Sequence, residues 1–141
     1  DGVAFLGDGL FGEEVLAKYG IPYIYDVRAF RESLERIRTL EANRYVPSHG
    51  GIIDDPAELG RLVDVNLRVS LEVEEAILSI LGRRRGFEDI LKALCDRYSV
   101  SLGYAQYILI GNTLRSYLSY LSDGGKARFS FEDNVMYWEG V

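Results

Sequence analysis

The spacing of apolar residues predicts a strand, two helices and a second strand in the first third of the chain. Residues 3–6 form a short apolar run typical of a buried strand, and a glycine-rich stretch follows it. Residues 13–18 predict a short helix that Gly20 and Pro22 close. Residues 21–25 are extended and apolar, and Pro22 limits them to an edge strand or a lead-in.

An amphipathic helix is expected next, because apolar residues recur at helical spacing over residues 27–41. Asp26 is placed to cap it, and residues 44–47 then predict a second strand, with His49 in the loop that follows. The apolar positions of the helix are Val27, Phe30, Leu34, Ile37 and Leu40. Its other face is expected to be solvated, with Arg28, Arg31, Glu32, Glu35, Arg36 and Arg38.

The second half of the chain predicts three helices and a hairpin. Pro56 follows two aspartates and fits the first turn of a long helix over residues 57–81. The length of this helix suggests that it connects two domains, with the boundary near residue 70. Further helices are expected over residues 87–98 and 102–122. Residues 127–131 and 135–138 flank a turn and predict a β-hairpin. Three helices followed by a hairpin are typical of a winged-helix-like module.

Composition limits the classes of protein that fit this pattern. With 141 residues and 48% hydrophobic content, the chain can form one ordinary core or two small ones. No apolar run approaches the roughly 18 residues of a membrane span, so we expect no membrane partner. The net charge of −6 argues against a general nucleic-acid binder. The single cysteine, Cys95, fits a reducing compartment such as the cytoplasm, and its place on an apolar helix face predicts burial.

The glycine-rich stretch from Gly7 to Gly12 matches the G-x-G-x-x-G pattern of dinucleotide-binding proteins, and Asp26 follows at a tolerable distance. Two observations disfavour that interpretation. The helix after the pattern is too short to be the crossover between two parallel strands. Asp8 would also place a carboxylate among the amides that should receive a pyrophosphate.

A metal site explains the same residues better. Asp8 stands between two glycines after the first predicted strand, and His49 precedes two glycines after the second. The helix over residues 27–41 is long enough to connect these strands, which would bring the carboxylate and the imidazole to adjacent loops. Asp8 and His49 are therefore the candidate metal ligands.

Residues 5–11 (Phe-Leu-Gly-Asp-Gly-Leu-Phe) and 45–50 (Tyr-Val-Pro-Ser-His-Gly) resemble the C-terminal half of a metallo-β-lactamase-fold hydrolase. The resemblance implies the second half of an αβ/βα fold over residues 1–69, followed by an α+β winged-helix-like module over residues 70–141. It implies that Asp8 bridges two metal ions, usually zinc, and that His49 completes the shell of one of them. Ser48 replaces a commoner glycine.

The family's His-x-His-x-Asp-His signature is absent, and the chain has one histidine in total. A catalytic zinc site needs about three protein ligands, so we expect a fragment of an enzyme about twice as long, inactive and a poor zinc binder by itself. The intact protein is expected to activate water and cleave a small-molecule ester, thioester or lactone, or a phosphodiester. No catalytic residue is assigned beyond the metal ligands.

The last predicted helix bears on the partners of the module. It carries Arg115 as its one cation and several tyrosines among leucines and isoleucines, which favours packing or homodimerisation over nucleic-acid binding. A small basic patch of Arg83, Arg84, Arg85, Lys126 and Arg128 is the opposing observation. The alternative to the hydrolase is therefore an interaction or nucleic-acid-binding module that carries a degenerate hydrolase remnant.

Overall fold

The computed structural model describes residues 2–141, which pack as two compact units. The first unit is the chain up to Pro22 together with Arg28–Leu71, and the second is Tyr23–Val27 together with Glu72–Val141. Compactness does not show that a unit folds alone, so the domain boundary expected near residue 70 stays a prediction. None of the helices in residues 2–141 is long and apolar enough to cross a membrane.

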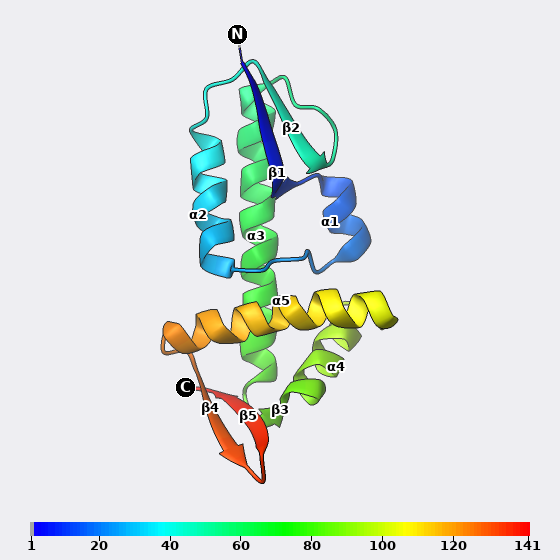
Figure 1. Cartoon of the computed structure of the whole chain (residues 1–141), viewed down its shortest axis with the longest axis vertical. Helices are drawn as coiled ribbons and strands as arrows, with labels where there is room; N and C mark the ends of the chain where they lie inside the picture. Colours follow the sequence, from blue (N-terminus) through cyan, green and yellow to red (C-terminus); the bar gives the residue numbers. More distant parts are fainter. Residues whose placement is uncertain (1) are drawn as a thin grey trace. The chain divides into compact units, whose positions relative to one another are not determined.

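The first unit is built on two parallel strands, β1 (Val3–Phe11) and β2 (Arg44–His49). Between them the chain forms α1 (Glu13–Tyr19) and α2 (Val27–Arg38), and α3 (Pro56–Ile80) begins after β2. Figure 1 shows β1 and β2 side by side, with α2 and the start of α3 beside them. The predicted strands and helices are confirmed, and β1 extends further than expected.

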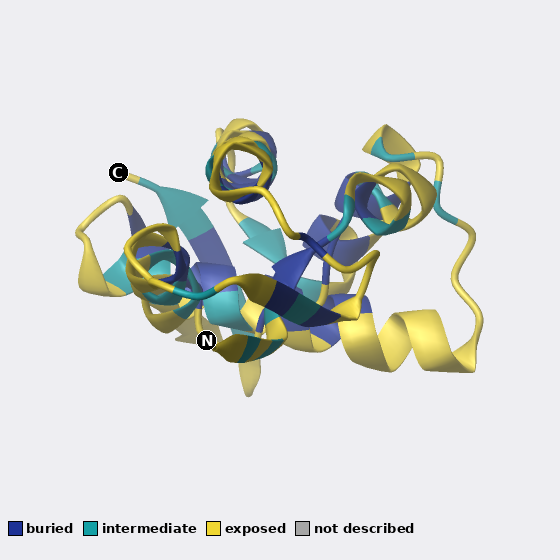
Figure 2. Ribbon diagram, turned by 90° about the horizontal axis from the view of Figure 1, so that it is seen from above, coloured by how far each residue is buried: buried dark blue, intermediate teal, exposed yellow. Residues whose placement is uncertain are grey.

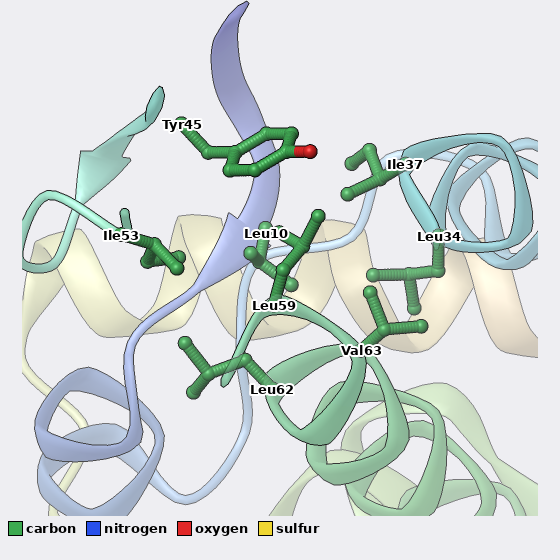
Figure 3. Close-up of a cluster of buried hydrophobic side chains, with 8 residues drawn as sticks. All are labelled: Leu10, Leu34, Ile37, Tyr45, Ile53, Leu59, Leu62 and Val63. Atoms are coloured by element: carbon green, nitrogen blue, oxygen red, sulfur yellow. The ribbon is translucent and has the colours of Figure 1, made fainter. Parts of the chain in front are cut away.

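The core of this unit lies between the sheet and helices α2 and α3. Leu10 and Tyr45 from the two strands meet leucines and a valine from both helices, and all of these side chains are buried (Figure 3). The cluster consists of Leu10, Leu34, Ile37, Tyr45, Ile53, Leu59, Leu62 and Val63. The buried and exposed faces of the helices can be followed by colour in Figure 2.

The prediction that residues 3–6 form a buried strand is wrong for Val3 and Phe5. Ala4 and Leu6 are partly buried against the core, but Val3 is 54% exposed and Phe5 is 81% exposed. Alternate residues of a strand point to opposite faces of the sheet, and at residues 3–6 the core cluster covers the face that Ala4 and Leu6 share. Val3 and Phe5 belong to the other face.

The expectation that every charged residue of α2 is solvated is also wrong for Arg31. Its Nε donates to Ser70 Oγ at 2.8 Å and its terminal nitrogen donates to the Ser70 carbonyl at 3.1 Å. Ser70 is fully buried in α3, so this arginine joins two helices rather than facing solvent alone.

The start of α3 agrees with the sequence analysis. Asp55 Oδ1 accepts the backbone N–H of Ala57 at 2.9 Å, which caps the first turn, and Pro56 is the first helical residue. Proline costs nothing there, because the first N–H groups of a helix have no partner within it.

The second unit contains the end of α3 followed by β3 (Arg85–Gly86), α4 (Phe87–Arg97), α5 (Tyr104–Asp123), β4 (Ala127–Glu132) and β5 (Val135–Gly140). The three strands form an antiparallel sheet in the order β3-β5-β4. The predicted hairpin is confirmed. Asp133 and Asn134 form its turn with φ of 49° and 62°, as expected of a two-residue turn with the primed geometry. The two-residue strand β3 was not predicted.

A segment distant in sequence also packs in the second unit. The Ile24 N–H donates to Thr113 Oγ1 and the Val27 N–H donates to Ser116 Oγ, each at 3.1 Å. Both hydroxyls lie on α5, and Ile24, Val27 and Thr113 are buried. The lead-in expected at residues 21–25 therefore forms no strand, and α5 provides its partners.

Tyr45 ties β2 to the loop before it. Its hydroxyl donates to the Leu40 carbonyl at 2.7 Å and accepts the Ala42 N–H at 3.2 Å, while its ring is 2% exposed. One side chain thus fills the core and satisfies two backbone groups of the connection from α2.

Tyr45→Phe should lower the free energy of unfolding by about 1–2 kcal/mol, because the ring still fits while the Leu40 carbonyl and the Ala42 N–H lose their partner. Urea unfolding followed by far-UV circular dichroism measures the change. Tyr19→Phe is the matched control, because Tyr19 is half exposed and the loss of its hydroxyl should cost nothing measurable. Equal stability of Tyr45→Phe and the unsubstituted chain would contradict the assigned role.

Candidate metal centre

An irregularity in the pairing of β1 and β2 presents Asp8. Gly7 pairs with Pro47 and Phe11 pairs with His49, so Asp8, Gly9 and Leu10 lie opposite the single residue Ser48. Gly7 has φ of +55°, a conformation that favours glycine. Extra residues of this kind bend a strand and redirect a side chain. The Asp8 side chain is 66% exposed, while Leu10 is buried.

His49 is the last residue of β2, which extends two residues beyond the strand predicted over residues 44–47, so His49 ends a strand and does not lie in the loop predicted for it. Its carbonyl accepts the Gly12 N–H at 2.9 Å. Its ring lies nearly parallel to that of Phe11, with an interplanar angle of 13° and 6.5 Å between ring centres. Backbone and ring contacts therefore both hold His49 against the end of β1.

The structure places the two predicted ligands next to each other. Asp8 Oδ1 lies 3.6 Å from His49 Nε2, and the His49 side chain is 58% exposed. This distance is too long for a direct hydrogen bond. Two donors on one tetrahedral zinc ion, each about 2.1 Å from the metal, are about 3.4 Å apart. The pair therefore has the spacing of two ligands that share an ion.

A close contact between two glycines fixes the strand ends beside this pair. A Cβ atom on Gly12 would lie 3.1 Å from the Gly50 Cα, and one on Gly50 would lie 3.3 Å from the Gly12 Cα. Gly50 also has φ of +145°. Side chains at these positions would push β1 and β2 apart directly behind His49.

Asn66 of α3 holds the end of β1 from its other side. Its Oδ1 accepts the Phe11 N–H at 3.1 Å, and its Nδ2 donates to the Phe11 carbonyl at 2.9 Å and to the Leu62 carbonyl at 2.8 Å. Asn66 is 1% exposed. The sequence analysis missed this residue, although a polar side chain four positions after Leu62, on the apolar side of a helix, was a signal for it.

The donors within residues 2–141 do not complete a metal site. No group of three or more histidine, cysteine, aspartate or glutamate residues gathers in that part of the chain. Asp8 and His49 fit a zinc ion by donor type and spacing, but they are two ligands where a catalytic site uses about three. Their assignment as metal ligands stays a prediction.

The two remaining candidates take no part in this arrangement. Cys95 is 3% exposed in α4, as predicted, and burial raises the pKa of its thiol. The glycine pattern after residue 6 is largely strand, because β1 continues to Phe11 and only Gly12 precedes the seven-residue helix α1. This placement disfavours a dinucleotide phosphate site further.

Comparison with solved structures identifies the fold. The chain matches a metallo-β-lactamase family protein from Thermus thermophilus with a TM-score of 0.67 and 19% identity, over 96% of this chain. It also matches a β-lactamase domain protein from Burkholderia ambifaria with a TM-score of 0.72 and 18% identity, over 100% of this chain. No protein-family model and no curated protein matches the sequence.

The chain spans 41% of the length of each of these two structures. It is therefore a mixed α/β chain with the fold of one segment of a metallo-β-lactamase family protein, as the residues around Asp8 and His49 indicated. The identities are low, so the likeness establishes the fold and leaves activity to be argued from the site.

Asn66→Ala should lower the free energy of unfolding by about 2–4 kcal/mol, because both backbone groups of Phe11 lose a buried partner. Asn112→Ala is the matched control, since Asn112 is an exposed helical asparagine and the gain in helix propensity is the same. Urea unfolding gives the difference. Hydrogen exchange at the Phe11 amide should become faster in Asn66→Ala alone, and unchanged protection there would contradict the role of Asn66.

Proposed function

We propose that this chain supplies two zinc ligands, Asp8 and His49, to a metal-dependent hydrolase of the metallo-β-lactamase superfamily. The observation that carries the proposal is the 3.6 Å separation of Asp8 Oδ1 and His49 Nε2 at the ends of adjacent parallel strands. The further ligands are proposed to come from an N-terminal half of the same protein. The reaction is water-dependent cleavage of a small-molecule ester, thioester or lactone, or of a phosphodiester.

Zinc, when bound, lowers the pKa of a coordinated water so that it becomes a nucleophile at neutral pH. The chain's own contribution is to hold donors in place. The bulge at Asp8 turns its carboxylate toward His49, and one oxygen suffices for an ion shared with the imidazole. A dinuclear centre is proposed because a carboxylate has two oxygens, so Asp8 would be able to help hold a second ion.

Phe11 and Asn66 would act on this chemistry through position alone. The Phe11 ring lies against the imidazole of His49 and limits its rotation. The Asn66 side chain fixes the backbone of Phe11 three residues after Asp8. A donor set held this way loses little conformational freedom when an ion binds.

We further propose that the second unit is a winged-helix-like module that serves packing or homodimerisation. Its cations are largely engaged within the unit. Arg84 pairs with Glu132 and Lys126 with Glu74, each at 2.7 Å, and Arg128 pairs with Glu139 at 2.9 Å. Arg115, the cation of α5, lies over the Phe87 ring at 4.1 Å. These contacts weaken the case for nucleic-acid binding, which needs several available cations.

Zinc added to the 141-residue chain should bind weakly and perturb the backbone amide signals of residues 7–9 and 48–50 in an NMR titration. Asp8→Ala and His49→Ala should each abolish these changes. Glu41→Ala, which removes an exposed carboxylate elsewhere in the first unit, is the control and should leave them intact. Perturbations that persist in both ligand variants would contradict the assignment.

In an intact protein that contains the remaining ligands, Asp8→Ala should reduce zinc content and abolish turnover. Elemental analysis of the purified variant reports the metal directly. Normal zinc content together with normal hydrolysis would overturn the proposed role. Stoichiometric zinc in the purified 141-residue chain would instead show that two ligands suffice and that the chain does not need a further segment.

A further inference from the structure

Strand β4 is an edge of the second unit's sheet. It pairs with β5 on one side, and the strand order β3-β5-β4 leaves its other side without a partner strand among residues 2–141 (Figure 1). Residues Arg128 to Glu132 are all exposed, including Phe129 at 50% and Phe131 at 66%. The register with β5 is continuous, without a bulge, and the strand contains no proline. β4 therefore lacks the bulge and the proline that often protect an edge, and its charged side chains are confined to Arg128 and Glu132.

The hairpin register shows which backbone groups face the open side. In a two-residue hairpin the pair beside the turn, Glu132 and Val135, is hydrogen-bonded, and every second pair after it is also hydrogen-bonded. Ser130 and Arg128 therefore direct their backbone groups toward β5. The N–H and C=O groups of Phe129 and Phe131 face the open edge.

The sequence of this edge is complementary to itself. Arg128-Phe129-Ser130-Phe131-Glu132 reads as a cation, an aromatic ring, a hydroxyl, an aromatic ring and an anion. If two such strands pair antiparallel with Ser130 opposite Ser130, each Arg128 faces a Glu132 and each Phe129 faces a Phe131. The residues whose backbone groups face outward then lie opposite one another and form the hydrogen-bonded pairs.

Neighbouring registers lose this match. A two-residue shift one way puts Phe129 opposite itself and Arg128 opposite Ser130, and the reverse shift puts Glu132 opposite Ser130. Larger shifts place Arg128 or Glu132 opposite its own copy, and like charges directly opposite are destabilising. Charge therefore selects the register centred on Ser130.

We propose that β4 pairs with β4 of a second copy of this chain about a two-fold axis at Ser130, which makes one continuous six-stranded sheet. The ion pairs within each chain add to this charge complementarity between the two copies. Arg128 already contacts Glu139, and Glu132 already contacts Arg84. Each pair across the axis thus completes a row of four side chains with alternating charge. Glu139 and Arg128 come from one copy, and Glu132 and Arg84 come from the other. The four phenylalanines cover the opposite face of the paired strands.

Sedimentation equilibrium of the full chain over a range of concentrations tests this pairing. The unsubstituted chain should dimerise reversibly, and Arg128→Glu or Glu132→Arg alone should weaken association more than about tenfold, because two attractive pairs become repulsive. The double variant R128E/E132R restores opposite charges across the axis but places like charges beside Glu139 and Arg84 within the chain. It should therefore dimerise more tightly than either single variant and more weakly than the unsubstituted chain. A mixture of the two single variants should form a heterodimer, although each alone is monomeric.

Ser130→Cys tests the register independently of charge. Residues opposite each other in a non-hydrogen-bonded pair have Cα atoms about 4.5 Å apart, which a disulfide can span. Mild oxidation should therefore give a covalent dimer of Ser130→Cys. Arg128→Cys should give none, because its symmetry mate is about 13 Å away along the strand. Cys95 is buried and does not compete.

The proposal fails if the unsubstituted chain stays monomeric at all concentrations. It also fails if the single charge variants dimerise as well as the unsubstituted chain, or if Arg128→Cys cross-links as readily as Ser130→Cys. Circular dichroism of each variant establishes that the hairpin is still folded. This inference rests on the homodimerisation proposed for the second unit. None of its outcomes depends on zinc binding by Asp8 and His49, so it and the proposed hydrolase function can fail separately.

Discussion

The first unit depends on the way one asparagine completes a sheet of two strands. Beyond its pairing with β2, the end of β1 has a backbone N–H and C=O at Phe11 that point away from the partner strand and are buried. The side-chain amide of Asn66 presents a donor and an acceptor in the arrangement that a third strand would offer. Helix α3 therefore takes the place of a strand at this point. The positions of Gly12, His49 and the bulge at Asp8 all follow from where β1 is held.

Local sequence patterns predicted most of the elements. Apolar residues at helical spacing located α2, α3, α4 and α5, while Gly20 and Pro22 located the end of α1 and Pro56 the start of α3, because these signals act within a few residues of the chain. The hairpin followed from an Asp-Asn turn between alternating strands. Patterns could not show that Val3 and Phe5 are exposed, because a short apolar run looks the same whether one or both faces of its strand are covered. Asn66 and Arg31 were missed since their partners are distant in sequence.

The proposed metal ligands could be selected from the sequence for a different reason. Asp8 and His49 each follow a strand, and glycines surround them, so the constraint on each was local. Their separation of 3.6 Å depends on the parallel pairing of β1 and β2, which no local pattern specifies. The length of the helix over residues 27–41 allowed that pairing and the resemblance to metallo-β-lactamase proteins implied it, and the match to solved structures at 18–19% identity agrees with it. The further ligands of the proposed zinc site could not be predicted, because residues 2–141 contain no third donor beside Asp8 and His49.

The packing of Tyr23–Val27 on α5 makes the second unit discontinuous in sequence. The chain passes between the units after Pro22, after Val27 and after Leu71, so a single cut cannot separate them. A fragment that starts at residue 72 would lack Ile24 and Val27 and would uncover the hydroxyls of Thr113 and Ser116 that bind them. A fragment that ends at residue 71 would keep residues 23–27 without the α5 hydroxyls that accept the Ile24 and Val27 N–H groups. Separate expression of either unit would therefore require a change in chain connectivity. Residues 23–27 would have to be fused to the second unit, and a linker would have to close the gap that they leave in the first.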